Sequence, residues 1–316
     1  MRSGIGRQLR QFLLAISAGS VGLRAQQHPQ EPTVNLGDTS FLDALGAPGV
    51  LLEQIGDASH SGTKIGGSGQ VVAGAPGVNS ISGLTHGVVL TKRKLLGAWW
   101  GFEAIVVTAH ANAGSSGVAG GLGDLTFSPL VLQWKAIKPS SSQFNQRFVL
   151  DFEVPSGEYR QDTPISLSGH AFTVHPYYAF TFFPTRKVET SWRVHYLYNG
   201  RNNDPAVGNQ AHSSQAGQAI HFNATAAYRL PHGVWVGANG YLLRELTAPQ
   251  INGLDVLSSP EQVGAIGPGI VWDRGQYLLY LIRKETTLGG GIHALVAGSG
   301  TPVILLPGMA RDRRSL

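Results

Sequence analysis

The chain has 316 residues, no cysteine and only 14% charged residues, whereas about a quarter of the residues of a soluble domain are usually charged. The absence of cysteine excludes thiolate catalysis and cysteine-ligated metal sites, and it is typical of proteins exported through an oxidising compartment. Four of the 24 basic residues and none of the 19 acidic residues lie in residues 1–25, so the remainder holds 20 basic and 19 acidic residues. This near balance excludes the basic surface of a nucleic-acid-binding protein.

Residues 1–25 have the layout of a signal peptide. Three arginines form a basic start, an apolar and small-residue stretch runs from Phe12 to Leu23, and Ala25 precedes a polar segment. We expect cleavage after Ala25, with Ala18 as the alternative site. A membrane anchor is the other interpretation, but the apolar stretch is shorter than the about 20 residues that a spanning helix needs. Residues 26–46 are predicted to form an irregular N-terminal segment.

From Gly49 onward, apolar and polar residues alternate with period two, which predicts β-strands with one apolar face. In residues 187–199, for example, Trp192 and Val194 share one face with two tyrosines, whereas Arg193 and His195 share the other. Eleven clear strands and a weaker twelfth follow from this pattern, near residues 47–57, 82–92, 98–110, 123–136, 146–155, 169–183, 187–199, 217–229, 233–246, 261–273, 276–285 and, for the weaker one, 292–305.

The strands and their connections predict a membrane barrel. Most strands are long enough to cross a bilayer when tilted, and no apolar run of helix length follows the leader. Tight turns at Pro184-Thr185 and Pro231-His232 alternate with long polar loops. We therefore expect an all-β fold, a transmembrane antiparallel up-and-down β-barrel of about 12 strands over residues 47–285, behind a cleaved N-terminal signal peptide. A soluble β-sandwich or lipocalin-like barrel is the alternative.

The predicted inward faces carry polar residues that we expect to line the lumen. Charge on the lipid face costs about 2–4 kcal/mol for Arg or Lys at mid-depth, so these side chains are expected to point inward. No cofactor or metal motif is present, and ordinary lumen lining is favoured over metal ligation for the histidines. The lumen candidates are Asp151, Glu153, His175, Arg193, His195, His221 and Asn223.

Two other functions stay open at this point. Ser191 and His195 share one inward face, as the nucleophile and base of an outer-membrane lipase or deacylase would, although no third partner is evident. A structural barrel without conduction is the other alternative. We favour transport and expect no catalytic residues.

Three short motifs have architectural explanations. Gly121 and Gly123 permit a turn conformation that other residues avoid, and Asp124 is expected to cap that turn through its carboxylate. Pro129 and Trp134 belong to the strand that follows. Near the end of the predicted barrel, Gly267, Pro268 and Gly269 are expected to bend a strand or form a bulge, because proline lacks the ladder donor.

Together with residues 221–241, these motifs resemble the MetA-pathway phenol-degradation family, also called SphA-like transporters. The resemblance covers roughly residues 45–285 in family order, and three separate motifs agree. It implies an outer-membrane barrel that transports small hydrophobic or aromatic compounds of the phenol type. The partners that it implies are outer-membrane lipids, the aromatic solute and the barrel-insertion machinery.

The tail, residues 286–316, departs from this pattern. The resemblance stops after Glu285, and a run of three glycines follows. The alternation of residues 292–305 is irregular, and the last residues are basic without an aromatic. A barrel without a last strand keeps an open edge, which lipid does not tolerate. Either residues 292–305 close the barrel, or the reading frame shifts near residue 286, which we favour. Translation of the coding DNA in the other two frames decides between them.

Overall fold

The computed structural model describes residues 41–61, 63–65, 77–114, 117–138, 140–162, 165–206, 211–256, 262–273, 278–288, 294–296 and 298–306. The predicted signal peptide and residues 26–40 of the predicted irregular segment lie outside these ranges.

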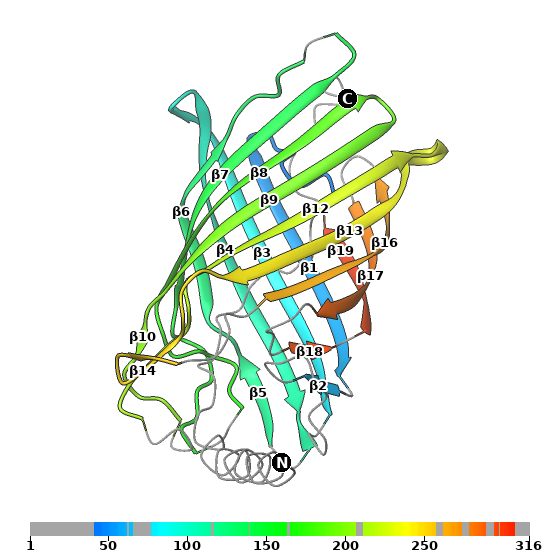
Figure 1. The fold of residues 1–316 in the computed structure, drawn as a ribbon. Helices are drawn as coiled ribbons and strands as arrows, with labels where there is room; N and C mark the ends of the chain where they lie inside the picture. Colours follow the sequence, from blue (N-terminus) through cyan, green and yellow to red (C-terminus); the bar gives the residue numbers. More distant parts are fainter. Residues whose placement is uncertain are drawn as a thin grey trace, which may run out of the picture.

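In the described part of the chain, twelve long antiparallel strands pair in a closed ring, so that each of them has a neighbour on both edges (Figure 1). The long loops carry six shorter strands, β2 (Thr63–Ile65), β5 (Val118–Leu122), β10 (Arg201–Asn202), β11 (Ser214–Gln215), β14 (Gln250–Ile251) and β15 (Leu254–Asp255), and a seventh, β18 (Ala294–Val296), pairs with β2. In order around the ring the long strands are β1 (Gly49–Ser61), β3 (Val78–Leu95), β4 (Ala98–Asn112), β6 (Leu125–Gln133), β7 (Gln143–Val154), β8 (Thr173–Thr185), β9 (Val188–Asn199), β12 (Ala219–Arg229), β13 (Val234–Glu245), β16 (Gln262–Asp273), β17 (Leu278–Leu288) and β19 (Gly298–Leu306).

The strand β19 closes the ring. It pairs with β17 on one edge, where Thr301 lies opposite Ile282, and with β1 on the other, where Leu306 lies opposite Leu52. The sequence left two explanations for the tail, and this position is the one expected if residues 292–305 close the barrel. The closed ring satisfies the requirement that no strand edge faces lipid.

The barrel has a polar interior and an apolar exterior. In β9 the odd-numbered side chains from Glu189 to Asn199 are buried, and the even-numbered ones from Trp192 to Tyr198 are exposed. Several other strands also expose large apolar side chains, among them Phe102 of β4 and Ile266 and Trp272 of β16. This inversion of the soluble pattern is typical of a barrel whose outer face contacts lipid. Among the described residues, no helix has the length and apolar character of a membrane span.

Short turns and long loops lie at opposite ends of the barrel, as Figure 1 shows with the short turns uppermost. The strands β8 and β9 are joined by Arg186–Lys187, whereas residues 155–172 connect β7 to β8 and residues 200–218 connect β9 to β12. In outer-membrane barrels the short turns face the periplasm and the long loops face outward. We orient this barrel accordingly.

One predicted turn is displaced. Pro184 and Thr185 do not form the turn but end β8, and the pairing of β8 with β9 shifts by one residue between Phe182 and Thr185. Proline has no backbone N–H to donate to the neighbouring strand, and the bulge accommodates this. The turn is therefore formed by residues 186 and 187. The other predicted turn is confirmed, since Pro231–Gly233 form a single 3-10 turn, η3, between β12 and β13.

The acidic residue of the first motif joins two loops and does not cap its own turn. Asp124 accepts hydrogen bonds from the Gly157 backbone N–H at 2.9 Å and from the Ser168 hydroxyl at 2.9 Å, both in the β7–β8 loop. Gly121 has a φ of +150°, which side-chain-bearing residues rarely adopt, but Gly123 has no such conformation. The glycine explanation therefore holds for Gly121 alone.

The other residues of this motif, Pro129 and Trp134, take part in a register shift and in hydrogen bonds between neighbouring strands. Pro129 lies where the β6–β7 register shifts, and its carbonyl accepts a hydrogen bond from the Trp100 indole at 3.1 Å. The Trp134 indole donates to the carbonyl of Leu96 in the β3–β4 turn at 3.2 Å.

Of the two outcomes expected at residues 267–269, a bend or a bulge, the bulge does not form. The β13–β16 register is continuous through Pro268, and the β16–β17 pairing keeps its register on both sides of Gly267 and Pro268 while skipping these two residues. The missing proline donor therefore interrupts the ladder toward β17 without shifting it.

The facing pattern of β9 makes a testable prediction. Val194 is 38% exposed on the lipid side, so Val194→Arg places a charge at the bilayer and should sharply reduce the amount of folded protein in outer membranes, measured as the heat-modifiable band in electrophoresis. Val194→Ala is the matched control and should insert normally. Normal insertion of Val194→Arg would contradict the assigned faces, because a slip of one residue exchanges them.

Candidate functional site

The predicted lumen residues lie on one inner wall formed by β7, β8, β9 and β12. All seven are buried, and they lie on the face of their strands that the alternation assigns to the interior. Strand pairing brings them together, since Asp151 lies opposite His175, His195 opposite His221, and Arg193 opposite Asn223.

Three of these residues form a stack of imidazole rings. The His195 and His221 ring centroids are 4.1 Å apart with planes 15° from parallel, and the His175 ring is 6.2 Å from that of His195. The Tyr177 ring lies 4.7 Å from His195. Among the described residues, none provides a hydrogen-bond partner for the six imidazole nitrogens, although His175 Nε2 lies 4.0 Å from Glu153. The stack is therefore a buried aromatic cluster with unused polar edges.

The stacked arrangement does not converge on a metal ion. The nitrogen lone pairs lie in the ring planes, and nearly parallel planes direct them side by side rather than to one point. Within the part of the chain that the structure describes, no group of three or more histidine, aspartate or glutamate side chains is placed to hold a metal.

A second polar cluster, which the sequence analysis did not select, lies on the wall formed by β1, β3 and β4. The His86 Nδ1 is 2.8 Å from a Glu53 carboxylate oxygen, and its Nε2 is 3.5 Å from Glu103. The Tyr177 hydroxyl, which belongs to the histidine wall, donates to Glu103 at 3.3 Å. The same alternation that selected Arg193 places His86 and Glu103 on inward faces, so the signal was available in the sequence.

Residues 41–46 lie inside the barrel, where they form hydrogen bonds with β6, β8 and β9, and Ala44 packs in a cluster with apolar residues of β3. The backbone N–H of Leu42 donates to Glu189 at 3.2 Å, and that of Ala44 donates to the Thr181 hydroxyl at 3.0 Å. From the wall, the Gln133 amide donates to the Ala44 carbonyl at 3.0 Å. The end of the predicted irregular segment is thus an ordered part of the interior, which we call the internal segment.

An ion pair fastens the internal segment at its centre. Arg193 donates through Nε to an Asp43 carboxylate oxygen at 2.8 Å and through Nη2 to the other oxygen. The guanidinium also lies 4.5 Å from the centroid of the Tyr177 ring. Both partners are almost fully buried, so the two charges depend on each other for compensation.

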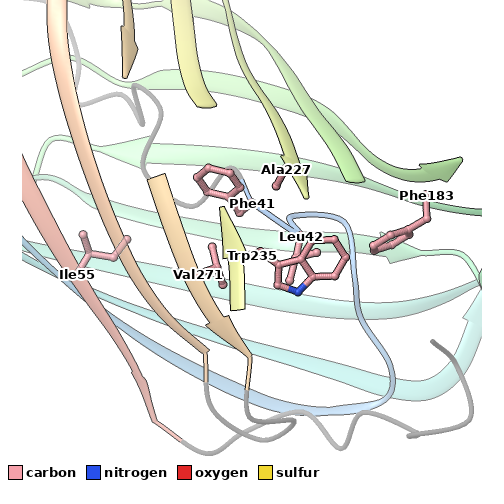
Figure 2. Close-up of a cluster of buried hydrophobic side chains, with 7 residues drawn as sticks. All are labelled: Phe41, Leu42, Ile55, Phe183, Ala227, Trp235 and Val271. Atoms are coloured by element: carbon pink, nitrogen blue, oxygen red, sulfur yellow. The ribbon is translucent and has the colours of Figure 1, made fainter. Parts of the chain in front are cut away.

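Apolar packing completes the attachment near the short-turn end. Figure 2 shows Phe41 and Leu42 of the internal segment among apolar side chains from the barrel wall, Trp235 the largest of them. The Phe183 ring lies 5.9 Å from that of Trp235. The seven members of this cluster are Phe41, Leu42, Ile55, Phe183, Ala227, Trp235 and Val271.

The proposed nucleophile and base of an enzyme do not meet. The Ser191 hydroxyl makes hydrogen bonds with Thr181 at 2.7 Å and with Glu189. His195 makes its ring contacts elsewhere, with Tyr177 and His221. Ser191 therefore belongs to the network that holds the internal segment.

The family model described as "Putative MetA-pathway of phenol degradation" matches residues 58–281, more than two thirds of the chain. The chain belongs to this family. Among solved structures, the COG4313 outer membrane channel from Pseudomonas putida F1 has the same fold, with a TM-score of 0.71 and 12% identity over 87% of this chain and 100% of that one.

Other outer-membrane proteins are more distant. The Pseudomonas putida toluene transporter TodX gives a TM-score of 0.41 at 8% identity, covering 91% of this chain and 96% of that one. The chain matches no curated protein sequence. With the apolar exterior, membership of the family makes this protein an outer-membrane β-barrel.

The ion pair between Asp43 and Arg193 can be tested by conductance. Removing one partner of a buried pair typically costs about 3–5 kcal/mol, so Asp43→Asn should loosen the internal segment, raise single-channel conductance in planar bilayers and lower the thermal unfolding midpoint. Asp162→Asn, which breaks an exposed pair with Arg160, is the control and should change neither. Unchanged conductance in Asp43→Asn would show that the pair does not hold the segment.

Proposed function

We propose that this protein is an outer-membrane channel that passes small hydrophobic or aromatic compounds of the phenol type for catabolism. The observation that carries the proposal is the closed ring with an apolar exterior and an interior lined by imidazole, phenol and guanidinium groups. The family's phenol-degradation description supports the solute class, and the fold shared with a COG4313 channel supports passage through the barrel.

The interior has surfaces suited to an aromatic alcohol. The stack of His175, His195 and His221 is buried in this structure and would offer ring edges and faces for aromatic contact once the internal segment shifts. Its nitrogens, which have no hydrogen-bond partner among the described residues, offer donors and acceptors for a hydroxyl group. A few polar groups on a mostly aromatic surface are the usual way in which a site orients a small ligand.

The internal segment lies on the path that a solute would take along the barrel axis. It contacts both walls, and its apolar residues fill the cluster near the short-turn end. We propose that passage requires this segment to shift, so that Asp43 and Arg193 act on permeation by positioning it.

The proposal includes the route to the membrane. Residues 1–25 act as a cleaved signal peptide, outer-membrane lipids surround the barrel, and the insertion machinery assembles it. Within residues 286–316, β19 acts as the closing strand. No catalytic role is proposed for any residue.

Phenol entry into outer-membrane vesicles tests the function. Vesicles that contain the protein and a trapped phenol-oxidising enzyme should oxidise external phenol several-fold faster than vesicles from a host that lacks the gene. Replacing His195 and His221 with phenylalanine keeps the rings and removes the nitrogens, so it should slow phenol entry and leave toluene entry, followed with a trapped toluene-oxidising enzyme, unchanged. Equal phenol entry with and without the protein would favour the non-conducting structural barrel.

A further inference from the structure

A cavity of about 230 Å³ lies at the short-turn end of the barrel. The β6–β7 loop contributes Lys138 and serines 140–142, the end of β8 and its turn contribute Phe183 and Arg186, and the end of β12 contributes Arg229. A cavity of roughly 150 Å³ accommodates benzene in another protein, so this volume is sufficient for a substituted benzene ring.

The charge of the lining is of one sign. Lys138, Arg186 and Arg229 line the cavity, together with serine hydroxyls, and no lining residue is acidic. On the neighbouring β9, Glu189 is turned into the barrel, where it accepts hydrogen bonds from Leu42 and Thr225. Cationic and hydroxyl donors around a small cavity favour an anion with several acceptor oxygens.

The cavity also has an aromatic side. Phe183 is only 4% exposed and packs against Trp235, so its ring is held in place by the apolar cluster. The Arg229 guanidinium lies 5.6 Å from the centroid of the Trp235 ring, which positions its charge beside this aromatic pair. An inorganic anion would make no aromatic contact with the ring of Phe183, and a hydrocarbon would make no ionic contact with the three cations.

We propose that this cavity binds a small aromatic carboxylate, with the ring against Phe183 and the carboxylate toward Lys138, Arg186 and Arg229. An anion of the size of benzoate can contact both the aromatic side and the cationic side of the lining. The site lies at the periplasmic mouth and is separate from the histidine stack. Binding at this cavity does not require conduction by the barrel, because the lining side chains form the cavity by themselves.

Binding of benzoate to the purified full-length protein in detergent tests the proposal by titration calorimetry. Wild-type protein should bind benzoate saturably, and toluene and acetate at least about tenfold more weakly, since each supplies half of the interaction. Arg186→Gln, in an exposed turn, and Arg229→Gln should each raise the benzoate Kd about tenfold, and added salt should weaken binding.

The matched control is Lys92→Gln, which removes one positive charge from the same end of the barrel outside the cavity and should leave the benzoate Kd unchanged. Phe183→Leu keeps apolar packing and should weaken benzoate while leaving acetate unaffected. Absence of saturable benzoate binding, equal binding of acetate, or equal loss in Lys92→Gln would each overturn the proposal. Benzoate binding without phenol passage would leave it standing and contradict the proposed channel function instead.

Discussion

Backbone hydrogen bonding in lipid is the constraint on which the rest of this structure depends. A membrane interior offers no water to an unpaired N–H or C=O, so a sheet can span it only as a closed ring. Here β19 closes the ring, because it pairs with both β17 and β1. Once the ring is closed, the period of two divides each strand into a lipid face and an inner face, and the polar residues have only the inner face to occupy.

The polar groups on the inner face are buried, so they need hydrogen-bond or charge partners inside the barrel. Many of these groups pair with one another, as Glu53 does with His86 on the adjacent strand and Arg193 does with Asp43 of the internal segment. The internal segment supplies backbone donors and acceptors where the walls lack partners. The histidine stack is the exception, since its nitrogens stay unused by protein groups in the described residues. Polar groups with unmet hydrogen bonds beside aromatic rings are the reason why we propose that a solute makes contacts at this wall.

Sequence patterning predicted the strands well because period two is a local signal that the membrane reinforces. The inward direction of His175, Arg193 and His221 follows from it. The ion pair between Asp43 and Arg193 does not, since nothing local shows that a segment before the first strand folds back into the barrel. The cap expected at Asp124 failed for a similar reason, because its partners Gly157 and Ser168 belong to a distant loop. At Pro184 the local sequence predicted a turn, but a bulge in the pairing of β8 with β9 allows this residue to remain part of the strand.

The closing contact between β1 and β19 can be measured directly, because the chain contains no cysteine. Glu53 lies opposite Leu305 in the register, so cysteines at these two positions should form a disulfide on oxidation of isolated outer membranes. The oxidised protein should then keep an altered electrophoretic migration after boiling, which reduction abolishes. A pair of cysteines at Glu53 and Gly298, at the opposite end of β19, should not cross-link. Failure of the first pair to cross-link in membranes that contain the inserted protein would contradict the closed barrel described here.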